Sequence, residues 1–137
     1  MVRREVIRKR LNKLDDYLGI LNGLKRYSFQ EFIENPEYYG STERFLHLAI
    51  EAVIDLGNHV IAELELGTVN WYSDIPKILA AKGYISEELE DRWIRMTGFR
   101  NTLVHEYIDI DRRIVFDVLH NNLQDLEDLK KVFAQFL

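Results

Sequence analysis

The amino-acid sequence predicts an all-α protein: a bundle of four main helices with one additional short helix, in a single domain spanning residues 1–137. Apolar residues recur every three or four positions along most of the chain, which is the period of an amphipathic helix. The chain contains only two prolines and seven glycines. No segment shows the alternating pattern of a strand.

The first two long helices are predicted over residues 3–26 and from Ser41 or Thr42 to near Gly67. The segment between them, "SFQEFIENPEYYG", contains Asn35-Pro36 and Gly40, which predict a connector that can include a short helical turn. Ser41 or Thr42 suits the N-cap of the second helix. The apolar positions of the first helix are Val6, Ile7, Leu11, Leu14, Leu18, Leu21 and Leu24.

The remaining elements are a short third helix and two further long ones. Ser73 is the expected N-cap of the short helix, and Gly83 lies beyond its end. Ser86 caps the fourth helix, which continues through Leu103. The last helix is predicted to begin at Asp109 or Asp111 and to run as one element through residue 136.

Composition limits the functional classes. The chain has no cysteine, which excludes disulfides, zinc–thiolate sites and cysteine nucleophiles. The N-terminus is basic without a continuous apolar stretch, and the longest apolar runs are only a few residues, so we expect neither a signal peptide nor a membrane span but a cytoplasmic protein.

Charge is distributed unevenly along the chain. The formal net charge is −5, which argues against broad, sequence-blind binding of nucleic acid. Residues 1–27 nevertheless carry +5, leaving −10 on the rest. This basic first helix is either a phosphate-facing surface or a solvated helix face. Its basic residues are Arg3, Arg4, Arg8, Lys9, Arg10, Lys13, Lys25 and Arg26.

The stretch "GFRNTLVHEY", residues 98–107, gathers the residues with the most chemical potential. On an ideal helix Arg100 and Tyr107 share one face, and Asn101 and His105 share a neighbouring one. Arg100 and His105 therefore diverge on a straight helix. They can converge on one phosphate only if the helix loosens around His105, or if a second subunit of a two-fold dimer supplies the complement.

These groups suit metal-independent cleavage of RNA. His105 would take the proton from a ribose 2′-OH, which then attacks the adjacent phosphorus. Arg100 would stabilise charge on the phosphorane-like transition state, and Asn101 would hold a phosphate oxygen or orient the imidazole. The need for a 2′-OH makes RNA the substrate. No HExxH or other ligand spacing is present, so we expect no metal and no other cofactor.

The spacing alone has a structural explanation as well. Arg100 could pair with an acid at a helix end while His105 caps backbone carbonyls. Other polar residues also allow more than one interpretation: Asn58 and His59 form either a buried hydrogen-bonded pair or an interface feature. Trp71 and Tyr72 are most simply packing or dimer-contact residues.

The sequence around the motif favours the functional interpretation over the structural one. "FRNTLVHEY" resembles the Arg-x4-His-x-Tyr signature of the HepT-like toxins, a branch of the HEPN superfamily of ribonucleases. Three further segments are similar to the family's helices: "ERFLHLAIEAVIDLGNHVIAE" (43–63), "IPKILAAKGYISEELEDRWIRMTGFRN" (75–101) and "YIDIDRRIVFDVLHNNLQDLEDL" (107–129). The resemblance covers roughly the C-terminal two-thirds of the chain and predicts a HEPN-type four-helix bundle.

The resemblance implies a function and two partners. Family members are homodimers that cleave RNA without metal and act as the toxin of a type VII-like toxin–antitoxin pair. Their antitoxin is a minimal nucleotidyltransferase that transfers AMP from ATP to the motif tyrosine, here Tyr107. The added bulk and negative charge would block the face that holds Arg100.

The leading hypothesis is therefore a homodimeric, metal-independent endoribonuclease toxin with Arg100 and His105 as catalytic residues. Asn101 would support phosphate binding and Tyr107 would accept AMP. The alternative is a non-catalytic helical module that binds a nucleotide, RNA or the nucleotidyltransferase partner. A purely structural dimerising bundle is a third possibility.

Overall fold

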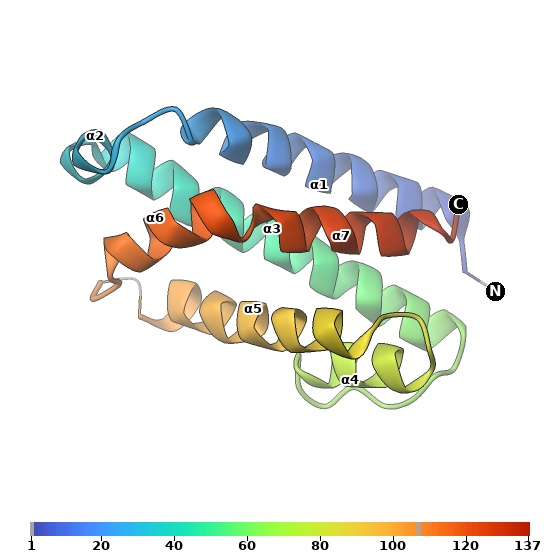
Figure 1. The fold of residues 1–137 in the computed structure, drawn as a ribbon. Coiled ribbons are helices and arrows are strands. Elements are labelled where there is room, and N and C mark those ends of the chain that lie inside the picture. Colours follow the sequence, from blue (N-terminus) through green and yellow to red (C-terminus); the bar gives the residue numbers. More distant parts are fainter. Residues whose placement is uncertain (1, 107) are drawn as a thin grey trace.

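The computed structural model describes residues 2–106 and 108–137, and every regular element in this part of the chain is a helix (Figure 1). The all-α prediction is confirmed. The described residues contain seven helices instead of the five predicted. In chain order these are α1 (Arg4–Leu24), α2 (Phe29–Glu34), α3 (Pro36–Glu63), α4 (Asp74–Ala81), α5 (Glu87–His105), α6 (Arg112–Asn121) and α7 (Leu123–Ala134).

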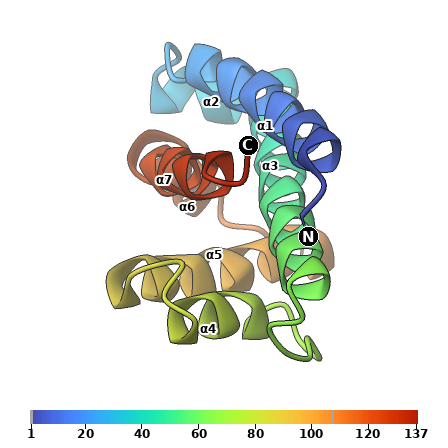
Figure 2. The same cartoon turned by 90° about the vertical axis from the view of Figure 1, so that its right-hand side faces the viewer.

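Helix α3 organises the fold, because it packs against each of the other six helices. It lies beside α1 on one side, while α4 and α5 pack on it at one end and α2 and α6 at the other (Figures 1 and 2). A single hydrophobic cluster draws buried residues from all seven helices. The predicted apolar stripe of α1 supplies Ile7, Leu11, Leu14, Leu18 and Leu21 to this core.

The same helix qualifies the prediction that nothing in the chain is apolar enough to cross a membrane. By length and composition alone, Pro36–Glu63 could span a bilayer, with a mean hydropathy of 1.3 over its most apolar window. Its apolar residues are interrupted by polar ones, so the length of unbroken apolar runs does not reveal it. The structure places it among the other helices, with 56% of that window buried, as expected for the central helix of a bundle.

The start of α3 differs from the prediction. The helix begins at Pro36 and not at Ser41 or Thr42, so Gly40 lies inside it. Proline is well suited to the first turn of a helix, where its missing N–H costs nothing. Thr42 is fully buried and its hydroxyl donates to the carbonyl of Tyr38 at 2.8 Å. The connector also holds a helix of its own, α2, which Ser28 and Glu31 start with a reciprocal capping box.

The predicted last helix is in fact two helices. It begins as expected after Asp111, whose side chain accepts from the backbone N–H of Arg113 at 2.9 Å. It then breaks at Asn122, which ends α6 and precedes α7. The apolar spacing continues through the break, so periodicity alone could not reveal it. Near the break, the two ring nitrogens of His120 lie 3.0 and 3.2 Å from the carbonyls of Phe116 and Lys25.

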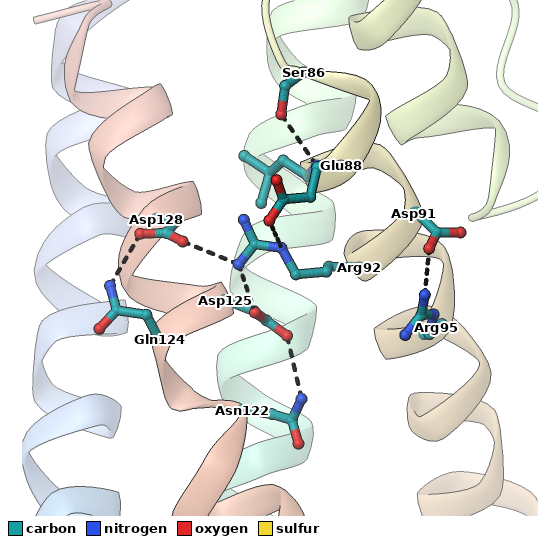
Figure 3. A network of polar contacts seen from close by, with 10 residues as sticks. Ser86, Glu88, Asp91, Arg92, Arg95, Asn122, Gln124, Asp125 and Asp128 are labelled. Atoms are coloured by element: carbon teal, nitrogen blue, oxygen red, sulfur yellow. Dashed lines mark hydrogen bonds and ion pairs between the residues drawn. The ribbon is translucent and has the colours of Figure 1, made fainter.

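Arg92 fastens the helix that carries the motif to the C-terminal helix. Its Nη1 donates to Asp125 of α7 at 2.7 Å and to Asp128 at 3.0 Å (Figure 3). Asn122 and Gln124 donate to the same two carboxylates at 3.4 and 2.9 Å, respectively. Asp125 is 9% exposed, so its charge depends on Arg92 for compensation. The network therefore fixes where α5 sits.

Helices α3, α4 and α5 come into close contact at Gly57. A Cβ added there would lie 2.4 Å from Cγ2 of Ile75 and 3.2 Å from the ring of Trp93. Both neighbours are fully buried, and the β-branched Ile75 has little freedom to move. The glycine of "GNHV" is thus a packing requirement. Two residues further on, the buried Nε2 of His59 has no hydrogen-bond partner among the described residues, so this nitrogen does not pair with Asn58.

We expect Gly57→Ala to destabilise the protein by about 1–3 kcal/mol, because overpacking at this contact outweighs the helix propensity gained from alanine. The matched control is Gly19→Ala in α1, where an added Cβ meets nothing within 4 Å. There, the same change should stabilise by about 0.5–1 kcal/mol. Urea unfolding of the two variants measures both changes. A stabilising Gly57→Ala would show that the three helices do not meet as described.

Candidate active site on α5

Helix α5 carries the motif to its C-terminal end. Ser86 caps its start by accepting from the N–H of Leu89 at 3.1 Å, as predicted, and acidic residues fill the first turn. The helix continues regularly to His105, and the N–H of Glu106 still donates to the carbonyl of Thr102 at 3.0 Å. The helix thus ends at His105, as the loosening hypothesis expected, but it stays regular up to that residue.

Arg100 is held at the α3–α5 contact. Its Nε donates to Oε1 of Glu51 at 2.6 Å, and its Nη1 donates to the side-chain oxygen of Asn101 at 3.1 Å. The guanidinium carbon lies 4.9 Å from the ring centroid of Tyr72, within reach of a cation–π interaction. The side chain is only 15% exposed. Pairing with an acid, expected from the structural explanation of the motif, is thus present.

This arrangement still leaves Arg100 able to bind an anion. A guanidinium has five N–H donors, and Nη2 makes no hydrogen bond within the described part of the chain. The Glu51 carboxylate fixes the plane of the guanidinium group, so the remaining nitrogen, Nη2, points in a defined direction. The same oxygen of Glu51 lies 3.4 Å from Nε2 of His47. His47 therefore shares a partner with the motif arginine.

His105 lies on a different side of α5. It is exposed, and its ring makes no hydrogen bond to the described residues, so the capping role in the structural explanation is not seen. With Asn101 it lines an open groove of about 750 Å³ between α5 and the segment before α4. Asn101 is the shared element, because it both contacts Arg100 and lines this groove.

The groove has residues that the motif did not predict. Besides Asn101 and His105, it is lined by Asn70, Trp71, Tyr72, Ser73, Ile94, Thr97 and Gly98. Trp71 and Tyr72, interpreted from the sequence as packing or dimer contacts, belong to this wall. Glu51 was also missed. Its i, i+4 spacing from His47 was the one available signal, and that spacing says nothing about a partner on another helix.

Two other hollows lie apart from this groove. One, of about 210 Å³, lies on another face of α5, is lined largely by apolar residues with Arg92 and Arg95, and contains none of the motif residues. The other, of about 450 Å³, is lined by Lys9, Arg10 and Lys13 of α1 and reaches Glu51. The basic face of α1 thus leads to the carboxylate that holds Arg100.

The fold and this site define an all-helical protein in which an Arg-x4-His motif forms the C-terminal end of α5, beside an open groove. A family model described as ribonuclease HepT-like matches residues 7–133. The chain belongs to this family. The predicted AMP acceptor of the motif, Tyr107, lies outside the described residues.

Named relatives and solved structures agree with this assignment. The chain is 31% identical over 121 residues to a tRNA nuclease HepT of Aphanizomenon flos-aquae, covering 87% of this chain and 81% of the relative. It is 34% identical over 82 residues to an mRNA nuclease HepT of Shewanella oneidensis, covering 60% of this chain and 62% of the relative. A solved structure of a tri-AMPylated Shewanella oneidensis HEPN toxin in complex with its MNT antitoxin superposes with a TM-score of 0.89 at 25% identity, over 97% of this chain and 99% of that one.

Proposed function

We propose that the protein is a metal-independent endoribonuclease toxin of the cytoplasm, with His105 and Arg100 as catalytic residues and Asn101 as a phosphate-binding support. The observation that carries this proposal is the intact motif at the end of α5 in a ribonuclease HepT-like chain. The relatives' names, tRNA nuclease and mRNA nuclease, support RNA as the substrate class.

The proposed reaction is an internal transesterification. His105 accepts the proton of a ribose 2′-OH, and the resulting oxygen attacks the neighbouring phosphorus. The bond from phosphorus to the 5′-oxygen of the next nucleotide breaks, leaving a 2′,3′-cyclic phosphate, and the departing 5′-oxygen takes the proton back from His105 to become a hydroxyl. Arg100 donates to the phosphoryl oxygens from Nη2, which makes no hydrogen bond to the described residues, as negative charge builds on them.

A homodimer is part of this proposal. Arg100 is directed toward Glu51 and His105 toward the groove, about 140° apart around α5. Because the helix is regular through His105, the two side chains leave α5 in different directions. A two-fold axis beside the end of α5 would place Arg100 of one subunit near His105 of the other.

Purified protein in EDTA should cleave RNA and leave cyclic-phosphate ends, which a chemical assay of the 3′ ends detects. RNA binding without any product would instead favour the alternative, a non-catalytic binding module. Sedimentation in the same buffer tests the dimer independently.

We further propose that a minimal nucleotidyltransferase antitoxin silences the protein by transferring AMP from ATP to Tyr107. The support is the Shewanella oneidensis HEPN toxin, which is described as tri-AMPylated and in complex with MNT antitoxin. AMP on the motif tyrosine would add negative charge beside the groups that bind RNA phosphate.

Incubating the protein with such a nucleotidyltransferase and ATP should raise its intact mass by one to three adenylyl groups and stop RNA cleavage. Tyr107→Phe should remove the modification, whereas Tyr72→Phe, on the groove wall, should leave it unchanged. Modification that persists in Tyr107→Phe would place the acceptor elsewhere.

A further inference from the structure

Trp71 is an aromatic residue in an unusual position. Its side chain is 75% exposed, whereas the chain's other tryptophan, Trp93, is fully buried. Leaving a ring of this size in water forgoes a large part of the hydrophobic stabilisation that burial would provide. An exposed tryptophan ring beside a groove is available to pack against a bound molecule.

The backbone that presents Trp71 is held firmly. The carboxylate of Asp74, in the first turn of α4, accepts from the backbone N–H groups of Asn70 and Trp71, both at 2.9 Å. These hydrogen bonds hold the pKa of Asp74 below its ordinary value. In return, the N–H of Asp74 donates to the carbonyl of Trp71 at 2.9 Å. The ring is therefore presented on an ordered turn, and little backbone entropy is lost when it binds a ligand.

Trp71 is also next to the catalytic groups. It lines the same groove as Asn101 and His105. The following residue, Tyr72, lies against the guanidinium of Arg100. The two consecutive aromatic residues thus have different positions. The Tyr72 ring contacts the motif arginine, and the more exposed Trp71 ring lies at the groove of the motif histidine.

A nucleobase fits this surface. Single-stranded RNA is generally held by stacking its bases on aromatic side chains while cations contact the phosphates. A strand whose phosphate lies at Arg100 would have its neighbouring bases within the groove. The groove offers few charged groups. Base stacking suits such a surface, because it depends on contact between ring faces and not on a particular pattern of hydrogen bonds.

We propose that Trp71 is a platform for a nucleobase of the RNA strand beside the scissile phosphate. This inference rests on the proposed ribonuclease function and names how that site holds its substrate. It predicts that unpaired RNA is preferred to duplex RNA, in which both faces of each base are already stacked.

The test uses a His105→Ala background, so that RNA is bound but not cut, with a single-stranded oligoadenylate as the probe. RNA should quench the emission of the exposed Trp71, and the quenching should vanish in Trp71→Phe, which retains only the buried Trp93. By fluorescence anisotropy of labelled RNA, Trp71→Ala should weaken binding by about 5- to 100-fold. Trp71→Phe should weaken it less, because it retains a ring.

An abasic strand of equal length is the matched control. It keeps every phosphate but has nothing to stack, so Trp71→Ala should not change its binding. The slope of affinity against salt should also be unaltered, since no phosphate contact is lost. Helical circular dichroism should be the same for all variants because Trp71 lies on the surface.

Three results would overturn the proposal: equal oligoadenylate binding by Trp71→Ala, an equal loss on the abasic strand, or conversion of the Trp71→Ala variant to a smaller species in sedimentation. A smaller species in sedimentation would mean that Trp71 packs against a second copy of the chain. RNA cleavage by the wild type in EDTA is measured in parallel, so a failure of the ribonuclease function is seen separately from a failure of stacking.

Discussion

Replacing His105 with alanine should reduce RNA cleavage by about 10²- to 10⁴-fold while leaving the protein folded. This range is what a positioned general base contributes to a proton transfer. His105 is exposed and makes no hydrogen bond within the described chain, so the fold does not depend on it. The measurement is the cleavage rate of a labelled RNA by purified protein in EDTA, compared with helical circular dichroism and the thermal midpoint.

The matched control is Glu106→Ala, which changes the next exposed residue and should leave the rate unchanged. Arg100→Ala should also abolish cleavage, by removing the cation that stabilises the transition state. It should cost some stability too, because Glu51 then loses its 2.6 Å ion pair at a half-buried contact. The thermal midpoint should therefore fall in Arg100→Ala and stay unchanged in His105→Ala.

The pH dependence gives an independent check. The cleavage rate of the wild type should change between about pH 5 and 8, the range in which histidine changes its charge. The proton carrier would not be His105 if wild type and His105→Ala degraded RNA equally, or if the rate were flat across this range.

The sequence was most informative where local chemistry decides the structure. The N-cap at Ser86, the stop at Gly83 with its φ of +83° and the stripe from Ile7 to Leu21 all lie where they were predicted. Each depends on one residue or on a periodic pattern within one helix.

Prediction failed where distant contacts decide the structure. The apolar pattern runs on through Asn122, although α6 ends and α7 begins there. The same limit applies to the site. The motif itself was found, but Glu51 lies 49 residues from Arg100 along the chain. No local signal links a carboxylate on α3 to a guanidinium on α5, or Trp71 to the groove of His105.

Replacing Arg92 with methionine should lower the free energy of unfolding by about 2–4 kcal/mol. Methionine keeps much of the apolar stem that arginine packs along α5 but removes the charge. Asp125, with a side chain only 12% exposed, then loses its 2.7 Å ion pair and becomes an uncompensated buried carboxylate. Urea unfolding at neutral pH, followed by circular dichroism, gives the value.

Arg95→Met is the matched control, three residues further along the same helix. Its ion pair with Asp91 joins side chains that are 75% and 61% exposed, and such pairs contribute at most about 1 kcal/mol. Similar losses in the two variants would show that Arg92 is no more important than a surface arginine, and that α5 is held to α7 by apolar contacts alone.

The origin of the loss can be tested by adding Asp125→Asn to Arg92→Met. If the cost comes from the uncompensated charge of Asp125, the double variant should regain part of the lost stability.

The pH dependence of stability supplies a second check. The pKa of Asp128 lies below its ordinary value, first because Gln124 donates to it and then because Arg92 does. A carboxyl with a lowered pKa stabilises the fold above its ordinary pKa and loses that contribution as the pH falls. The gap between wild type and Arg92→Met should therefore narrow below about pH 4, and a gap that stays constant would mean that α5 and α7 are not joined through these carboxylates.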